Sequence, residues 1–350
     1  MKYQRKLLAG ITGYVPGEQP EIPGVIKLNT NENPYPPSPQ VLEALRNLDT
    51  EHIRRYPDPA CSRLRRAWAE RFNLPGPEWV IVGNGMDDLL SLAVRAFVDP
   101  GDAVAATYPT YSLYEVLCGL HGARMEYHDL DERFGMPESL LSSRARLCFL
   151  TRPNAPTGVS ATREETAQLC ERFPGIVVID EAYVDFADDH CMDYAARYEN
   201  ALVMRTFSKS FSLAGMRVGV AAGHPDLIAE MMKVKDSYNV NAFSQVAALV
   251  ALEDWEYMRA CAERVRISRD RLREQLTGLG FSVPRSQTNF LLAVWDGRPP
   301  ARELFEALRE RNIFVRYFPV RRLENALRIT VGDDSQCDAL VAALRDLLCK

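Results

Sequence analysis

One lysine lies in a setting that suits amine chemistry. The chain has only seven lysines, and Lys209 alone follows a predicted strand inside a serine-rich turn, in the run RTFSKSFSLAGMRVG at 205–219. Partial burial and a neighbouring cation such as Arg217 lower the pKa of a lysine toward that of a nucleophilic amine. Thr206, Ser208 and Arg217 are donors suited to a phosphate. The run therefore favours an imine-forming lysine over a solvated one.

A carboxylate ends another predicted strand. In GIVVIDEAYVDF, an apolar run ends at Asp180, and Tyr183 follows three residues later. The carboxyl ends of parallel strands are where α/β sheets place ligand groups. A buried carboxylate there could hold a protonated ring nitrogen, with the tyrosine in reach of the same ligand. Asp180 could equally be a helix cap, and the run alone does not decide between the two.

A third run, VIVGNGMDDLL at 80–90, joins a predicted strand to a predicted helix through two glycines. Free backbone N–H groups of Gly85, Met86 and Asp87 at a helix start would point at an anion such as a phosphate. The run matches neither G-x-G-x-x-G nor a P-loop. Taken alone it favours an ordinary tight turn.

Together these three runs call for a cofactor with an aldehyde, a phosphate and a pyridine ring, and pyridoxal 5'-phosphate has all three. The order of motifs resembles that of the fold-type I aminotransferases, and most closely the histidinol-phosphate aminotransferase family. The matching motifs are KLNTNENPYPPSP (27–39), RRYPDP (54–59), GNGMDD (83–88), PTYSLY (109–114), PNAPTG (153–158), DEAY (180–183), RTFSKSFSLAGMRVG (205–219) and LRITVG (327–332).

The resemblance implies catalytic roles for four residues. Lys209 would carry the cofactor as an imine and then act as the general base. Asp180 would keep the pyridine nitrogen protonated. Tyr183 would hydrogen-bond the phenolic oxygen of the cofactor, and Tyr111 would stack on its ring.

The resemblance also implies how the phosphate of the cofactor is held. The implied phosphate-binding residues are Gly85, Met86, Asp87, Thr206, Ser208 and Arg217. Tyr56 resembles a tyrosine that reaches this phosphate from a second subunit. The resemblance therefore implies a homodimer whose active site is shared between subunits.

Three further residues match substrate-binding positions. Arg328 resembles the arginine that binds the carboxylate of the amino donor. Arg316 resembles a second arginine, directed at a phosphate, and Tyr14 a tyrosine that closes over that phosphate. An arginine suits both anions because its planar fork pairs two oxygens at once.

One motif departs from the family. Relatives commonly place an asparagine directly before the proline of PNAPTG, where it bonds the phenolic oxygen of the cofactor, and this chain has Ala155 there. Asn154, one residue earlier, is the candidate replacement. Asn31 and Glu32 lie in a stretch that the family keeps near the active site, and the sequence assigns them no role.

The resemblance implies ping-pong transamination in histidine biosynthesis, between L-glutamate/2-oxoglutarate and imidazole-acetol phosphate/L-histidinol phosphate. An aromatic amino-acid aminotransferase and a threonine-phosphate decarboxylase would use the same lysine, aspartate and arginine, and both stay open. A non-catalytic regulator that binds pyridoxal phosphate is less favoured, because the domain begins near Tyr35 and little chain precedes it for a DNA-binding module.

Seven β-rich runs must position these residues. They lie near residues 80, 105, 125, 148, 178, 204 and 220 and alternate with segments of helical period. This alternation predicts an α/β fold with a seven-stranded, mostly parallel sheet. We expect an N-terminal arm (1–34), a large cofactor-binding domain (35–240) and a smaller α+β domain (241–350) that opens with a long helix, interrupted or continuous, ending at Gly278 or Gly280.

Composition excludes other classes of protein. With 350 residues, 47% of them hydrophobic, the chain can bury a large core. A net charge of −5 argues against a nucleic-acid partner. The eight cysteines show neither a C-x-x-C pair nor zinc spacing with histidine, so we expect no metal site. Neither a signal peptide nor a membrane span is predicted, which suggests a cytoplasmic protein.

Overall fold

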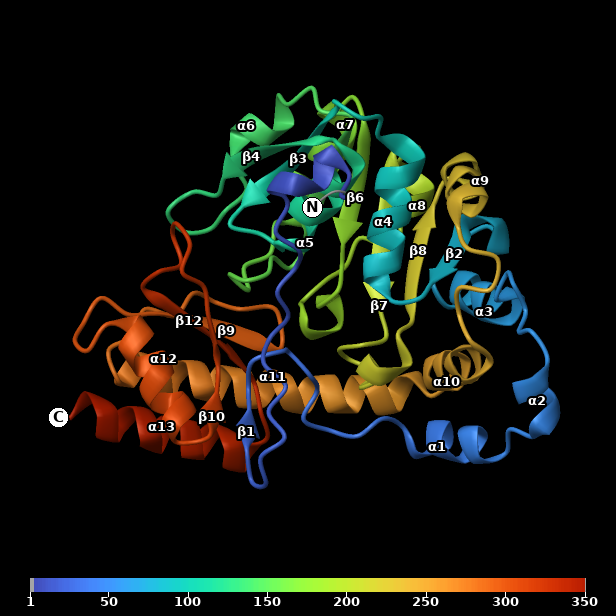
Figure 1. The fold of residues 1–350 in the computed structure, drawn as a ribbon. Helices are drawn as coiled ribbons and strands as arrows, with labels where there is room; N and C mark the ends of the chain where they lie inside the picture. Colours follow the sequence, from blue (N-terminus) through green and yellow to red (C-terminus); the bar gives the residue numbers. More distant parts are fainter. Residues whose placement is uncertain (1–2, 350) are drawn as a thin grey trace.

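A seven-stranded sheet forms the centre of the computed structural model (Figure 1). The structure describes residues 3–349, so residues 1–2 of the predicted arm and residue 350 of the predicted C-terminal domain lie outside the described residues. In spatial order the strands are β2 (Val80–Gly83), β8 (Gly219–Gly223), β7 (Ala201–Thr206), β6 (Ile176–Asp180), β5 (Leu147–Thr151), β3 (Ala103–Tyr108) and β4 (Arg124–Asp129). β8 runs antiparallel to both of its neighbours, and the other pairs are parallel. The seven predicted strands and the mostly parallel sheet are confirmed.

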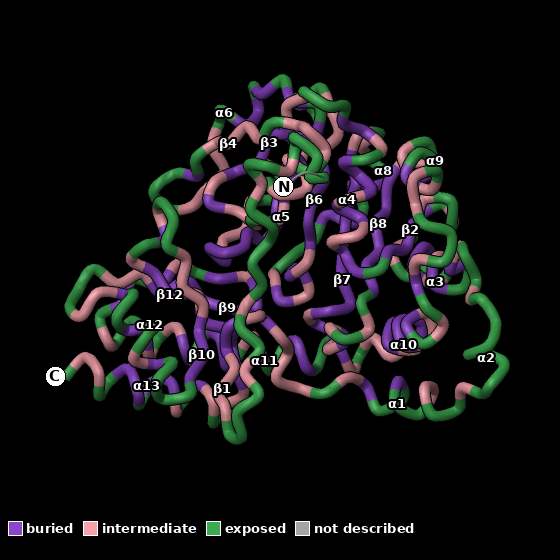
Figure 2. The backbone as a smooth tube through the Cα atoms, in the orientation of Figure 1, coloured by how far each residue is buried: buried purple, intermediate pink, exposed green. Residues whose placement is uncertain are grey.

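Helices cover both faces of this sheet, so its central strands are buried throughout (Figure 2). Because side chains alternate along a strand, Ile81 packs into one core, and its neighbours Val80 and Val82 pack into the other. The helices of the first core are α4 (Met86–Phe97), α5 (Leu113–His121) and α9 (Pro225–Val234). Those of the second include α3 (Ser62–Arg71), α6 (Glu138–Leu141), α7 (Arg163–Arg172), α8 (Tyr194–Arg197) and the 3-10 helix η3 (Val184–Phe186).

The long predicted helix is interrupted. α10 (Ala242–Glu253) and α11 (Trp255–Gly278) meet at Asp254, whose backbone leaves the helical region with φ −90° and ψ 50°. α11 ends where Gly280 takes a φ of +97°, which a glycine adopts without steric cost. Along its length α11 packs against β9 and α13 of the C-terminal elements (Figure 1).

The C-terminal elements form a second, smaller sheet of three antiparallel strands. Its order is β11 (Arg316–Tyr317), β12 (Ala326–Thr330) and β9 (Phe290–Val294), with α12 (Ala301–Glu310) and α13 (Asp334–Leu348) packed nearby. β1 (Ile26–Lys27) pairs in parallel with β10 (Ile313–Phe314). The N-terminal segment is thereby joined to the last part of the chain, and the proposed boundaries at 34 and 240 stay a prediction.

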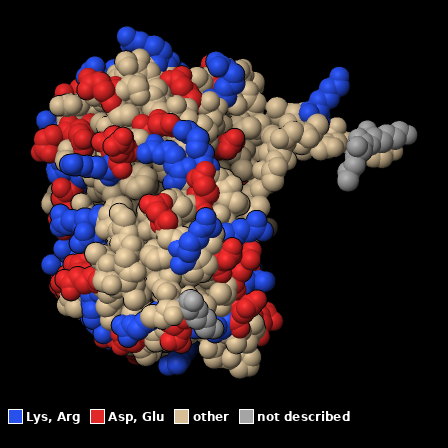
Figure 3. Space-filling view, turned by 90° about the vertical axis from the view of Figure 1, so that its left-hand side faces the viewer, with Lys and Arg blue, Asp and Glu red and all other residues tan. Residues whose placement is uncertain are grey.

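The remaining elements are short. They are α1 (Pro39–Arg46), α2 (Thr50–Arg54), η1 (Lys6–Gly10), η2 (Pro77–Trp79) and η4 (Ala214–Met216). The space-filling view shows basic and acidic side chains interspersed over one face of the molecule (Figure 3). Between residues 3 and 349, no helix has both the length and the apolar character that crossing a membrane requires.

Gly219 at the start of β8 allows a close approach that the site needs. A Cβ atom there would lie 2.6 Å from the backbone nitrogen of Met86 and 2.7 Å from the carbonyl carbon of Gly85. We expect Gly219→Ala to lower the free energy of unfolding by roughly 1–3 kcal/mol, because both neighbours are backbone atoms that cannot yield easily.

Thermal unfolding of the two single variants Gly219→Ala and Gly215→Ala checks this prediction. A Cβ at Gly215 would meet no atom within 4 Å, so this control is expected to unfold at the wild-type temperature or slightly above it. Equal melting temperatures for both variants would contradict the steric argument.

Candidate active site

A cavity of about 470 Å³ opens at one edge of the large sheet. The carboxyl ends of the parallel strands meet there, and this is the edge at which α/β sheets place ligand groups. Segments that follow β2, β3, β6 and β7 line it, together with Arg217, which precedes the antiparallel β8, and Arg316 and Arg328 of the small sheet. The predicted residues in its wall are Tyr14, Met86, Asp87, Tyr111, Asp180, Tyr183, Thr206, Ser208, Lys209, Arg217, Arg316 and Arg328.

Asp180 is a buried carboxylate without a cationic partner among the described residues. It ends β6 and is 1% exposed. Its Oδ2 accepts a hydrogen bond from the Tyr114 hydroxyl at 2.5 Å, and its Oδ1 accepts one from the backbone N–H of Ala182 at 3.0 Å. Burial raises the pKa of Asp180 to about 6, against the opposing effect of these hydrogen bonds. The site is therefore suited to a protonated or cationic ligand atom.

Tyr114 supports Asp180, and the sequence analysis missed it. Its ring stacks on Phe149 at a centroid distance of 4.3 Å, and its hydroxyl lies 2.8 Å from the Oγ1 of Thr151. The side chain is fully buried within the apolar face of α5. In the sequence it looks like a core residue at helical spacing, so only the register of β5 and β6 shows that its hydroxyl reaches Asp180.

Lys209 follows β7 and points into the cavity. Its Nζ donates to the carbonyl oxygen of Thr30 at 3.2 Å. Burial lowers the pKa of Lys209 to about 8, and the positive charge of Arg328 adds to this effect more than that of Arg217 does. The expected cationic neighbour is thus Arg328 first and Arg217 second. A large fraction of this lysine is neutral near pH 8, as a nucleophilic amine requires.

One end of the cavity offers donors for a phosphate. Arg217 Nη1 lies 3.2 Å from the Oγ of Ser208, and α4 begins at Met86 with its free N–H groups at this end. Gly85 has a φ of +85°, and a Cβ atom there would lie 2.6 Å from Arg217 Nη2. Gly85 does not itself line the cavity, but only a glycine at this position leaves room for the Arg217 side chain.

Two arginines stand at the other end. Arg316 and Arg328 are directly opposite each other on β11 and β12, an arrangement in which like charges repel. Burial and the charge of Arg316 lower the pKa of Arg328, whose Nε is buried without a partner among the described residues. Arg328 Nη2 donates to the carbonyl of Asn29 at 2.7 Å. An anion between these arginines would relieve the repulsion.

The N-terminal arm lies across this end of the cavity. Arg316 donates to the backbone carbonyls of Val15 at 3.0 Å and Pro16 at 3.2 Å. The ring of Tyr14 meets the edge of Tyr111 at a centroid distance of 5.7 Å. Tyr14 and Tyr111 therefore line the cavity together, along with Lys209 and Arg316.

Three alternate asparagines in the loop after β1 touch separate parts of the site. The backbone carbonyl of Asn29 accepts a hydrogen bond from Arg328. Asn31 Nδ2 donates to the Tyr183 hydroxyl at 2.9 Å. Asn33 Nδ2 donates to the carbonyls of Lys209 at 3.2 Å and Ser210 at 3.1 Å. The signal in the sequence is the group of asparagines in N-T-N-E-N, where the backbone turns at Asn31 with a φ of +58°.

The structure brings neither Asn154 nor Tyr56 into the cavity wall. The Nδ2 of Asn154 donates to the carbonyl of Pro109 at 3.1 Å and to the Oγ1 of Thr157 at 2.9 Å, and Ala155 lines the cavity instead. The amide of Asn154 is thus used by these loop atoms, and the expectation that it replaces the missing asparagine stays a prediction. Tyr56 is 80% exposed and stacks on Tyr238 at 4.4 Å.

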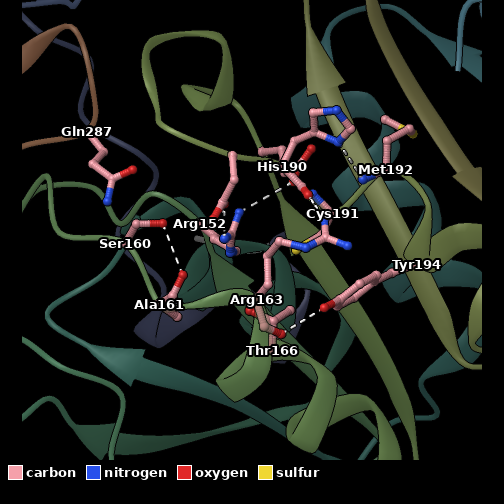
Figure 4. Close-up of polar contacts among 12 residues, drawn as sticks. Arg152, Ser160, Ala161, Arg163, Thr166, His190, Cys191, Met192, Tyr194 and Gln287 are labelled. Carbon is pink, nitrogen blue, oxygen red and sulfur yellow. Dashed lines mark hydrogen bonds and ion pairs between the residues drawn. The ribbon is translucent and has the colours of Figure 1, made fainter.

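A buried ionic network on the opposite side of β6 holds the loops of the site. Glu181 Oε2 accepts from Arg205 Nε at 2.9 Å, and Asp185 accepts from the Oγ of Ser210, the residue after Lys209, at 2.5 Å. Arg152 at the end of β5 pairs with Asp189, beside the segment that carries His190 and Cys191 (Figure 4). These contacts fix the loops after β5, β6 and β7 relative to one another.

The comparisons with known proteins agree with this fold. The family model "Aminotransferase class I and II" matches residues 23–344. The chain therefore belongs to the aminotransferase class I and II family.

Curated relatives match the whole chain. Histidinol-phosphate aminotransferase 1 of Trichormus variabilis is 43% identical over 351 residues, which cover 99% of each chain. Histidinol-phosphate aminotransferase of Synechocystis sp. is 45% identical over 336 residues, 95% of each chain. The solved structure of histidinol-phosphate aminotransferase from Sinorhizobium meliloti, in complex with pyridoxal-5'-phosphate, superposes with a TM-score of 0.85 at 26% identity and covers 92% of this chain and 90% of that chain.

The raised pKa of Asp180 predicts how the stability of the ligand-free protein depends on pH. In the folded state the pKa of Asp180 is about 6, whereas the ordinary pKa of an aspartate is 3.8. Asp180 therefore contributes stability below about pH 4 that is lost as the pH rises through about 6. The difference between these two pKa values corresponds to roughly 3 kcal/mol in the free energy of unfolding.

Thermal unfolding of the ligand-free wild type and Asp180→Asn between pH 4.5 and 8 checks this prediction. We expect the difference in melting temperature between wild type and variant to move in favour of the wild type as the pH falls through about 6, because the amide does not titrate. Parallel pH profiles would show that Asp180 is ionised in both states.

Proposed function

We propose that this chain is a pyridoxal-phosphate-dependent histidinol-phosphate aminotransferase. It transfers the amino group of L-glutamate to imidazole-acetol phosphate and yields 2-oxoglutarate and L-histidinol phosphate. The observation that carries this proposal is the match over 99% of the chain to a curated enzyme of that name at 43% identity.

The residues of the cavity fit pyridoxal phosphate. At one end, Arg217, Ser208 and the start of α4 form a cluster of donors, and a side chain at Gly85 would fill the space they leave. Asp180 is a buried carboxylate at the end of β6. Lys209, whose pKa is lowered, lies between this cluster and Arg328. When bound, the cofactor supplies an aldehyde that captures amines and a ring that accepts an electron pair. Tyr111 would cover one face of this ring.

Lys209 and Asp180 would be the residues that accept protons or hold them in place. The neutral Lys209 amine would hold the cofactor through its aldehyde, and it would be the base that accepts the proton of the substrate carbon that bears the amino group. Asp180 would hold a proton on the ring nitrogen, since the resulting positive charge compensates a carboxylate that otherwise lacks a cation. Tyr183 would donate to the phenolic oxygen.

The two cationic ends of the cavity would bind the two anions. Arg217, Ser208, Thr206 and the backbone N–H groups of Met86 and Asp87 would hold the phosphate of the cofactor. Arg328 would bind the carboxylate of glutamate. Arg316 and Tyr14 would bind the phosphate of the second substrate, for which Arg316 exchanges its bonds to arm carbonyls for stronger charged ones.

The proposed enzyme acts as a cytoplasmic homodimer. Tyr56, Tyr238 and Ile53 form an exposed apolar group, of which Tyr56 and Ile53 are more than half exposed. A second subunit over this group would bury it and bring Tyr56 toward the phosphate of the partner's site. All eight cysteines are free thiols, which fits a reducing compartment.

Substrate choice distinguishes this function from related ones. We expect the purified protein to lose its visible absorption when glutamate is added and to turn over histidinol phosphate far faster than phenylalanine. Assays with these amines and with threonine phosphate, followed by product analysis, check the prediction. A preference for phenylalanine would indicate an aromatic amino-acid aminotransferase instead. Release of carbon dioxide from threonine phosphate would indicate a threonine-phosphate decarboxylase.

The lowered pKa of Lys209 predicts the pH dependence of cofactor capture. The rate at which the cofactor-free protein gains visible absorption with pyridoxal phosphate should rise about tenfold per pH unit below about pH 8 and then level off, because only the neutral amine reacts. Stopped-flow absorbance measures it.

Lys209→Ala should show no such absorption while keeping the wild-type melting behaviour. Lys233→Ala is the matched control, since Lys233 lies on the exposed surface of α9 and pairs only with Glu230 among the described residues. A rate that keeps rising to pH 10 in the wild type would assign the reaction to an unperturbed lysine.

A further inference from the structure

The amide of Asn31 has an orientation that its neighbours determine. Asn31 is 1% exposed and has a φ of +58°. Its backbone N–H donates to the Oγ1 of Thr330 at 3.0 Å, and that hydroxyl lies 3.0 Å from the Oδ1 of Asn31. Among the described residues, this Oδ1 is the acceptor that the buried Thr330 hydroxyl reaches, so the hydroxyl donates to it. Oδ1 therefore faces Thr330, and Nδ2 faces away.

Nδ2 of Asn31 faces the hydroxyl of Tyr183 at 2.9 Å. An amide nitrogen can only donate, so the Tyr183 oxygen is the acceptor in this hydrogen bond. A phenol has one proton, and this proton must then be directed elsewhere. Tyr183 lines the cavity, so the proton points into it.

Burial keeps Tyr183 protonated. Lys209 Nζ lies 5.6 Å from the centre of its ring, and Phe290 meets the ring edge-on at 5.0 Å. Burial raises the pKa of Tyr183, and Asp180 and Asp87 act in the same direction, while Arg328 and the Asn31 hydrogen bond oppose them. The net pKa lies above its usual range, so the hydroxyl is a donor at neutral pH.

The alanine at position 155 makes the Tyr183 hydroxyl more important as a donor. Ala155 lines the cavity where relatives commonly carry an asparagine, and Asn154 is engaged by Pro109 and Thr157. Neither residue offers a side-chain donor to the cavity. Of these three residues, only Tyr183 can donate to a phenolic oxygen bound there.

We propose that Asn31, oriented by Thr330, is a positioning residue that forces Tyr183 to donate its proton to the phenolic oxygen of the cofactor. This inference rests on the proposed function, because it requires pyridoxal phosphate in the cavity. Neither Asn31 nor Thr330 touches the reacting atoms in this scheme. Both act through the direction of one proton.

Asn31→Asp reverses that direction. The carboxylate accepts where the amide donated, so Tyr183 turns its proton away from the cavity, and an aspartate tolerates the left-handed backbone. The hydrogen bond to the phenolic oxygen is strongest when the nitrogen that links Lys209 to the cofactor is unprotonated. Its loss should therefore move the midpoint of the visible absorption titration of the substrate-free holoenzyme to higher pH, by about one unit.

The added negative charge also raises this midpoint, and a double-mutant cycle separates the two effects. In a Tyr183→Phe background, Asn31→Asp retains its charge but has no hydroxyl to turn. We expect a clearly smaller shift there than in the wild-type background. Equal shifts in both backgrounds, or no shift in either, would overturn the proposal.

A pair of variants at Thr330 keeps the proposal testable if Asn31→Asp does not bind the cofactor. Thr330→Ser retains the hydroxyl that orients the amide and should titrate like the wild type, whereas Thr330→Val frees the amide and should shift the midpoint upward. Equal midpoints for both variants would refute the orienting role. A wild type that never gains visible absorption with pyridoxal phosphate would instead refute the proposed function.

Discussion

The buried carboxylate of Asp180 is the constraint on which the rest of the site depends. Taking a carboxylate out of water is costly unless hydrogen bonds or a cation compensate it. Here a tyrosine hydroxyl and one backbone N–H supply hydrogen bonds, and no cation pairs with it among the described residues. The fold thus keeps a place for a positive charge that a ligand brings. The stacking of Tyr114 on Phe149 and the register of β5 with β6 hold this arrangement.

Parallel strands explain why so many functional residues meet in a small volume. Six strands of the large sheet, β2 to β7, end at one edge, and β8 begins there because it runs the other way. Each following loop contributes one or two side chains, while the cores on both faces fix the strands. The ionic network of Glu181, Arg205 and Asp185 adds a second set of restraints behind the same loops. The cavity is therefore built on rigid elements, with the arm across one end.

Much of this could be predicted from the sequence, for physical reasons that differ by residue. The strands were predicted because buried parallel strands are continuous apolar runs, and Lys209, Asp180 and Arg217 because each follows or precedes such a run. Tyr114 could not be found in this way, since a buried tyrosine on a helix looks like core until its hydroxyl partner is known. The contacts of Asn154 with its own loop and a neighbouring one could not be predicted, because sequence spacing does not show where an amide points. The partners of Asn31 lie far away in the sequence, beyond the reach of any local pattern.

The pairing of β1 with β10 has a consequence for biosynthesis. Asn31 bonds to Thr330 across a separation of 299 residues, and Leu28 bonds to both Phe314 and Thr330. Contacts of such long range form late, since they need nearly the entire chain. Until β10 and β12 are synthesised, the loop that orients Tyr183 and bonds to the carbonyls of Lys209 and Ser210 lacks its contacts with Phe314 and Thr330. A nascent chain can thus complete its large sheet while its catalytic pocket stays unfinished until β12 is synthesised.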